Sequence, residues 1–110
     1  MRVKRSADLA ANTGTTLIPF TAEDYDTFGF HDNSTNPSRL TVPTGYAGYY
    51  HVTGNVTWEG ASMTTDQVRK LSLQRNAAGS SGAATTFAEC EEMTNAAGSD
   101  SPQEVSGTVY

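Results

Sequence analysis

The sequence has few of the residues on which disulfide-rich proteins, metalloproteins and membrane proteins depend. The single cysteine, Cys90, excludes an intramolecular disulfide, and one cysteine with two histidines, His31 and His51, cannot supply a zinc-binding pattern. No apolar run approaches the roughly 20 residues that cross a bilayer, so no membrane span is expected. The glycines also lack the spacing of a phosphate-binding loop.

Positive charge is scarce as well. Seven Lys and Arg residues stand against twelve Asp and Glu residues, which gives a net charge of −5. This balance disfavours nucleic acid as a partner, because its binding depends on clustered cations. Three cations, Arg2, Lys4 and Arg5, lie at the N-terminus and are candidates for docking on an acidic partner, although a solvated edge strand or terminus is the simpler interpretation. Polar residues follow them, so no signal peptide is expected.

The residues that are abundant favour strands over helices. Apolar residues make up 36% of the chain and the mean hydropathy is −0.47, so the core must be thin. Thr, Ser, Gly and Asn are frequent. Thr suits a half-exposed pleated surface, whereas Gly and Thr both weaken a helix. A length of 110 residues predicts a single domain over 1–110, in which 1–8 form a basic N-terminal arm or a first strand.

The clearest periodicity in the chain runs from 49 to 59. Tyr50, Val52, Val56 and Trp58 alternate with polar residues, and Gly54 lies on the same face. A period of two over this length predicts a strand with one buried face, in which Trp58 points to the interior. A side chain from a facing strand is expected to fill the space that Gly54 leaves.

Shorter patterns predict the other elements. Strands are expected at 15–21, 39–42, 67–75, 85–93 and from 105 onward, and loops at 23–27 and 31–38. For 67–75 an amphipathic helix is the alternative, but the alternation of Leu71 and Leu73 with polar residues favours a strand. Several short strands separated by turn residues indicate an all-β fold, an antiparallel β-sandwich or jelly roll. The chain stops at Tyr110 within the last expected strand. Because this would leave an unpaired edge, we expect the natural gene product to continue beyond this point.

The sequence offers little chemistry. No nucleophile with a neighbouring base can be identified, so neither an enzymatic activity nor a cofactor is expected. Asp24 and Asp26, on either side of Tyr25, are candidates for a structural calcium site, because carboxylates in loops suit this cation. A polar turn is the favoured interpretation of the same residues.

A more specific pattern lies between residues 25 and 58. The run Arg39-Leu40-Thr41-Val42-Pro43-Thr44-Gly45, then Gly48-Tyr49-Tyr50-His51-Val52, resembles the F-x-x-P-x-x-G-x-Y-x-F centre of C1q/TNF-like jelly rolls. The segment Tyr25–Phe30 resembles the loop and strand that precede this centre. The opening run Arg2–Ala7, taken with 25–27, resembles the short variants of bacteriophage and bacterial proteins more than it resembles animal complement proteins. Leu40 stands where the family often has Phe.

This resemblance implies a compact jelly roll that assembles as a homotrimer and acts by binding. In bacteriophages such domains decorate capsids or lie at the ends of head or tail fibres. We therefore expect a structural protein of the virion whose partners are copies of itself and other capsid or tail proteins. The candidates for burial in the core or in the trimer interface are the aromatic residues Phe20, Phe28, Phe30, Tyr46, Tyr50 and Trp58.

The alternative function is recognition of a host glycan or a cell-surface receptor, at a fibre tip or on a bacterial surface protein. Tyr46, Tyr49 and Trp58 would be able to stack on sugars if their rings faced solvent. Because the alternation places Tyr50 and Trp58 on the apolar face, the sequence favours a core position for these two residues.

Overall fold

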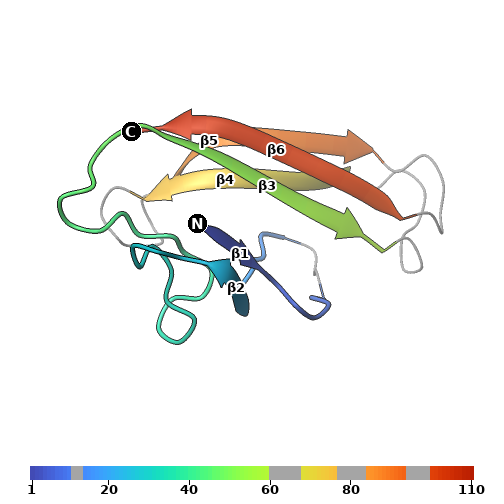
Figure 1. Cartoon of the computed structure of the whole chain (residues 1–110). Coiled ribbons are helices and arrows are strands. Elements are labelled where there is room, and N and C mark those ends of the chain that lie inside the picture. Colours follow the sequence, from blue (N-terminus) through green and yellow to red (C-terminus); the bar gives the residue numbers. More distant parts are fainter. Residues whose placement is uncertain (11–13, 60–67, 77–83, 94–99) are drawn as a thin grey trace. The chain divides into compact units, whose positions relative to one another are not determined.

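Strands and the loops between them make up the part of the chain that the computed structural model describes, residues 1–10, 14–59, 68–76, 84–93 and 100–110. These residues form six antiparallel strands and no helix, which confirms the predicted all-β class (Figure 1). Within them, no helix is long and apolar enough to cross a bilayer. The chain divides into two compact units, Met1–Ala47 and Gly48–Tyr110.

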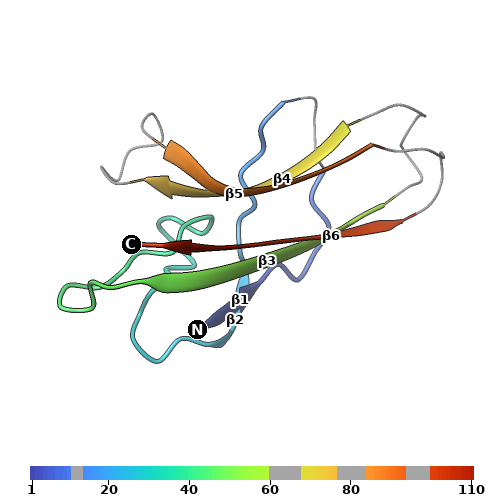
Figure 2. The same cartoon turned by 90° about the horizontal axis from the view of Figure 1, so that it is seen from above.

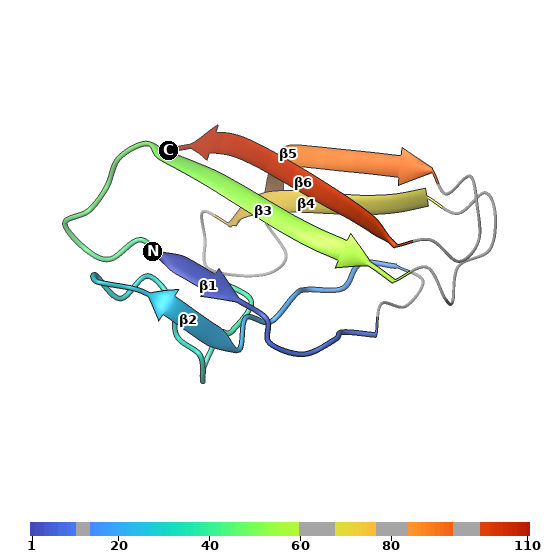
Figure 3. The same cartoon turned by 45° about the vertical axis from the view of Figure 1, so that its right-hand side comes forward.

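The first unit contains a short two-stranded ribbon and long loops. Strand β1 (Arg2–Lys4) pairs antiparallel with β2 (Ala22–Tyr25), with a register shift between Arg2 and Val3 (Figure 3). Further along the chain, an isolated bridge joins His31 and Leu40. This bridge is the only pairing described within 39–42, so the strand predicted there is reduced to a single residue.

The strand predicted at 15–21 is wrong. That segment has no ladder partner among the described residues, and strand β2 (Ala22–Tyr25) overlaps instead with 23–27, the stretch that the sequence predicts as a polar loop. Pro19 explains part of the difference, because it has no N–H to donate to a neighbouring strand. The first main-chain bond to β1 comes from Thr21, whose N–H donates to the Lys4 carbonyl over 3.0 Å.

The second unit holds four longer strands. They are β3 (Tyr50–Trp58), β4 (Val68–Asn76), β5 (Ala84–Met93) and β6 (Ser101–Val109). Strands β3 and β6 form one antiparallel pair without irregularity, and β4 and β5 form another with a shift between Leu73 and Gln74. Figure 2 shows the two pairs as two layers of this unit. The predicted strands at 49–59, 67–75 and 85–93 are confirmed over the described residues, outside which position 67 lies. The last strand begins earlier than predicted, at Ser101.

The two sheets of the second unit face each other across a thin core. Strand β6 contacts both β4 and β5, an arrangement compatible with a β-sandwich. Leu73 fills the space at Gly54, since a Cβ atom added there would lie 3.4 Å from Leu73 Cδ2. This confirms the expected role of a facing side chain. Among the described residues, the buried hydrophobic side chains are those of Leu71 and Val105, which are 8% and 4% exposed.

Candidate functional site

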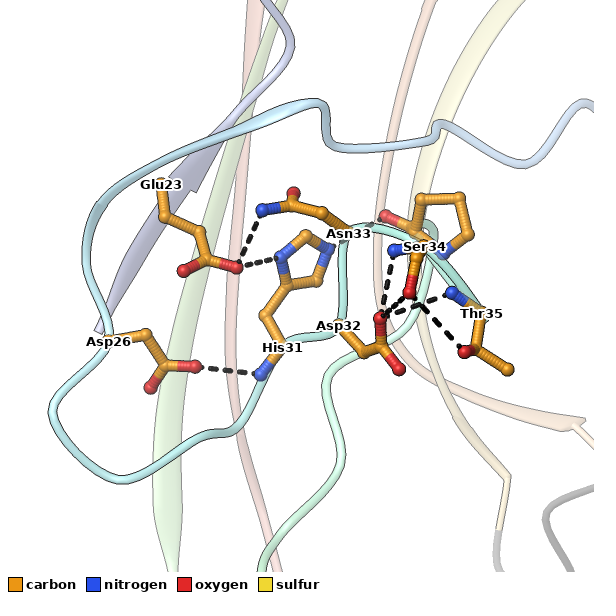
Figure 4. Close-up of polar contacts among 8 residues, drawn as sticks. Glu23, Asp26, His31, Asp32, Asn33, Ser34 and Thr35 are labelled. Atoms are coloured by element: carbon orange, nitrogen blue, oxygen red, sulfur yellow. Dashed lines mark hydrogen bonds and ion pairs between the residues drawn. The ribbon is translucent and has the colours of Figure 1, made fainter.

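A network of polar side chains surrounds His31 in the first unit (Figure 4). The His31 side chain is fully enclosed, at 0% exposure. Its Nδ1 lies 2.8 Å from Glu23 Oε1, and its Nε2 lies 3.0 Å from the Pro37 carbonyl oxygen. Both ring nitrogens therefore face oxygen acceptors. Only the doubly protonated imidazolium donates to both of them at once.

The loop that carries His31 is folded around the Asp26 carboxylate. The main-chain N–H of His31 donates to Asp26 Oδ2 over 2.8 Å. Gly29 adopts a φ of 71°, a left-handed conformation that side chains rarely occupy, and this lets the chain turn back toward Asp26. Burial by itself would raise the pKa of Asp26, but main-chain N–H groups, that of His31 foremost, outweigh it and hold this pKa below its usual value.

The next turn, residues 32–35, is organised by a second carboxylate. Asp32 Oδ1 accepts hydrogen bonds from the Ser34 N–H, the Ser34 hydroxyl and the Thr35 N–H, over 2.8, 2.7 and 3.1 Å. These bonds favour the ionised carboxylate and hold the pKa of Asp32 well below its usual range. Asn33, the next residue in this turn, donates from Nδ2 to Glu23 Oε1 over 3.0 Å. The Glu23 carboxylate therefore contacts both Asn33 and His31.

The protonation of His31 results from opposing effects. Burial disfavours the charged ring and lowers its pKa, whereas the hydrogen bond to the Pro37 carbonyl and the contact with Glu23 favour the charge. The two acceptors together outweigh burial, and the pKa of His31 is raised above its usual value. The edge of the Phe20 ring also packs against His31, with centroids 5.9 Å apart. With its side chain enclosed and both ring nitrogens engaged, His31 ties its loop to Glu23 and to the Pro37 carbonyl.

The basic N-terminal residues make contacts within the first unit. Arg2 and Lys4 on β1 both contact the Asp24 carboxylate on β2, and the Arg2 Nε–Asp24 Oδ2 distance is 3.3 Å. The hydrogen bond from Lys4 is the main cause of a lowered Asp24 pKa. Arg5 donates to the carbonyls of Pro19 and Asp8, over 3.4 and 2.9 Å. Docking of these three cations on an acidic partner stays a prediction.

The two carboxylates considered for calcium are held by protein donors. Asp24 contacts Arg2 and Lys4, and Asp26 contacts the main chain at His31. In the described ranges, no three His, Cys, Asp or Glu residues come together in a way that could hold a metal ion.

The candidate aromatic residues separate into distinct environments. Phe20 and Phe30 are half-buried in the first unit. Phe28 and Tyr46 contact each other with ring centroids 5.0 Å apart, yet they stay 56% and 45% exposed. Tyr50 and Trp58 lie in the second unit on the inner face of β3. The alternation of half-buried and exposed residues along this strand confirms the predicted faces.

Polar groups occupy the inner face at the Trp58 end of the second unit. Trp58 Nε1 donates to Gln103 Oε1 over 2.8 Å, and Gln103 Nε2 donates to the Arg69 carbonyl over 3.3 Å. Arg69 itself is 3% exposed, and its Nε and Nη2 have no hydrogen-bond partner in the described part of the chain. Glu92 lies opposite Arg69 in the β4–β5 register, but its carboxylate accepts from the Ser101 hydroxyl.

Arg69 and Gln103 were not predicted as buried, although the sequence contains a signal for them. Arg69 falls in the same alternation as Leu71 and Leu73 on β4, and Gln103 lies two residues before Val105 on β6. In a strand, every second side chain points to the same face, so the alternation places these polar residues on the apolar face. The His31 network had no such signal, because its acceptors come from loops and from a strand that the sequence did not predict.

Comparison with known proteins finds no family model, curated protein or solved structure that matches this chain. The likeness to C1q/TNF-like jelly rolls therefore stays a prediction from the residues that carry it.

Proposed function

We propose that this chain is a non-enzymatic structural module that completes its core by associating with copies of itself, as a homotrimeric jelly roll of a bacteriophage virion. The observation that carries the proposal is the small amount of apolar surface that the described residues bury. Leu71 and Val105 are the buried hydrophobic residues among them, while Leu17, Phe28 and Tyr46 stay 60%, 56% and 45% exposed. Association removes such surface from water, which is the main favourable term in forming most interfaces.

The exposed apolar residues of the first unit support a contact surface there. Leu17, Tyr25, Phe28, Val42 and Tyr46 are all large and exposed. Single exposed apolar residues need no explanation, but contacting rings such as those of Phe28 and Tyr46 are typical of interaction sites. These two residues are the proposed contact between subunits.

The strand edges also favour assembly. Each sheet of the described residues contains two strands, so each strand has a ladder partner on one side. Strands β3 and β6 present open edges of nine residues. Unpaired N–H and C=O groups along such an edge are a template for another strand. In the proposed trimer, neighbouring subunits cover part of these edges.

The setting of the proposal comes from the sequence resemblance. It places the trimer on a capsid, as a decoration or head-fibre protein, or on a tail, with other virion proteins as partners. Arg2, Lys4 and Arg5 are the proposed docking residues. The enclosed His31 ring is consistent with a structural and not a catalytic role.

The mass of the protein in solution tests the assembly. Sedimentation at micromolar concentration should give three times the 11.7 kDa monomer mass. Phe28→Glu should lower this mass, whereas the neighbouring exposed substitution Thr27→Glu is the matched control and should not. A wild-type chain that stays monomeric would contradict self-association. Electron microscopy of source particles tests the setting, and absence of the chain from particles would exclude a virion role.

A further inference from the structure

The outer face of the β3–β6 sheet ends in two exposed tyrosines. Tyr49 directly precedes β3 and Tyr110 directly follows β6, and the pairing of Tyr50 with Val109 places these two residues opposite each other. Their ring centroids lie 5.0 Å apart, although the residues are 80% and 67% exposed. Two large rings that contact each other and remain so exposed contribute little buried area to the fold. Such rings are typical of binding surfaces.

A row of polar side chains continues from the tyrosines along the same face. Alternate side chains of a strand point to opposite faces of the sheet, and the exposed set marks the outer face of β3 and β6. They are His51, Thr53, Asn55 and Thr57 on β3, and Pro102, Glu104, Ser106 and Thr108 on β6. A strand of nine residues is about 30 Å long. The face thus joins an aromatic pair to a long row of hydroxyl, amide and carboxylate groups.

We propose that this face binds a neutral oligosaccharide chain. A sugar ring has apolar C–H faces, which pack on aromatic rings, and hydroxyl groups at its edge, which both donate and accept hydrogen bonds. Tyr49 and Tyr110 supply the rings. Asn55 and Glu104, a cross-strand pair, supply an amide and a carboxylate that bind hydroxyl groups from two sides.

The platform is formed by the protein alone, without a ligand. The β3–β6 ladder runs over nine residue pairs without a register shift. At its end, Arg75 Nη1 donates to the Tyr110 carbonyl oxygen over 2.7 Å, which holds the last residue in place. A preformed surface loses less conformational entropy on binding than a mobile one.

The charge of the face favours a sugar over a nucleic acid. Single-stranded nucleic acids also stack on aromatic side chains, but they require a groove of positive charge. The outward residues of β3 and β6 include Glu104 and no Lys or Arg. A protein partner fits less well, because beyond the two tyrosines the row is almost entirely polar.

The proposed site differs from the one that the sequence predicts for glycans. Of the three rings considered there, Tyr49 faces solvent, Trp58 lies on the inner face of β3, and Tyr46 belongs to the first unit. Tyr110 was missed because its strand partner could not be identified from the sequence. The inference does not depend on the trimer proposed above.

Binding of the full chain to an array of immobilised neutral glycans, followed by calorimetry with the best soluble hexasaccharide, tests the proposal. Tyr49→Ala and Tyr110→Ala should each weaken binding by about tenfold, as expected for the loss of a stacking ring. Asn55→Ala should weaken it less. Tyr25→Ala removes a tyrosine of the first unit that is 57% exposed, and it should leave the affinity unchanged.

Several results would overturn the inference. The first is a wild-type chain that binds no neutral glycan on the array, and the second is Tyr49→Ala binding with unchanged affinity. A third is binding of oligo(dT), lost in the Tyr49→Ala variant, because it would assign the face to nucleic acid. Unchanged Trp58 fluorescence and an unchanged sedimented mass of the variants show that a loss of binding is local.

Discussion

Strands of nine and ten residues build the second unit, with inward and outward side chains alternating along β3 and β6, whereas the first unit has strands of three and four residues and long loops. In the second unit, apolar residues such as Leu71 and Val105 lie between two sheets. In the first, an enclosed His31 with Glu23 and Asp26 holds the loops. The comparison teaches that a sustained period of two leads to paired sheets. In the first unit, which lacks this alternation, hydrogen bonds between side chains and the main chain hold the loops.

The largest expected effect is on the second unit, at Trp58. Trp58→Ala removes a large ring from the inner face and leaves the buried Gln103 Oε1 without its donor. We expect the free energy of unfolding to fall by about 3 kcal/mol, since the ring is only half-buried. Urea unfolding followed by circular dichroism measures this loss. Trp58→Phe keeps most of the ring and should cost less, about 1–2 kcal/mol.

The fluorescence of the wild-type chain checks the same assignment. Trp58 is the single tryptophan, so its emission reports on the second unit alone. A blue-shifted maximum and resistance to iodide are expected for a ring on the inner face. A maximum equal to that of free tryptophan in water would contradict this placement.

A smaller effect is expected where β6 packs on β5. A Cβ atom at Gly107 would lie 2.8 Å from Ala88 Cβ and 3.1 Å from Phe87 Cδ2, so Gly107→Ala forces the two sheets to move. We expect a loss of about 1–3 kcal/mol in the free energy of unfolding, measured in urea by Trp58 fluorescence. Gly54→Ala is the matched control. Its Cβ would meet Leu73 at an ordinary 3.4 Å, and equal losses in the two variants would argue against the packing.

The smallest effect is expected in the first unit, as a dependence on pH. The pKa of His31 is raised from 6.5, so the folded unit holds the proton more tightly than the unfolded chain. Its stabilising contribution is fully present below pH 6.5 and is lost as the pH rises through the folded-state pKa. Nuclear magnetic resonance of the His31 ring and of amide signals from 23–37, between pH 5 and 9, measures this loss.

Two controls separate the units in that titration. His31→Gln removes the titrating ring and should flatten the pH dependence of the first unit. Trp58 fluorescence should show no parallel loss of the second unit over the same range. A His31 ring that titrates below pH 6.5 would mean that burial outweighs Glu23 and Pro37.

The sequence predicted those strands in which apolar and polar residues alternate within the strand itself. The alternation from Tyr50 to Trp58 predicted the faces of β3 and, to within one residue at each end, its bounds, and Leu71 with Leu73 favoured a strand at β4. The predicted strand at 15–21 was wrong, and β2 was missed. The reason is that β2 (Ala-Glu-Asp-Tyr) has no apolar alternation, and its partner β1, whose Arg2 and Lys4 contact Asp24, lies in a distant part of the chain.

By itself, the sequence determined that the described chain is all-β and that Trp58 points inward, because the face of a residue in a strand depends only on its position in the alternation. The tertiary structure alone decided which strands pair, and so which side chains meet. It brought Tyr49 beside Tyr110, Trp58 to Gln103 and Glu23 to His31. The first two contacts join segments far apart in the chain, and all three depend on packing and hydrogen bonding that no local sequence pattern predicts.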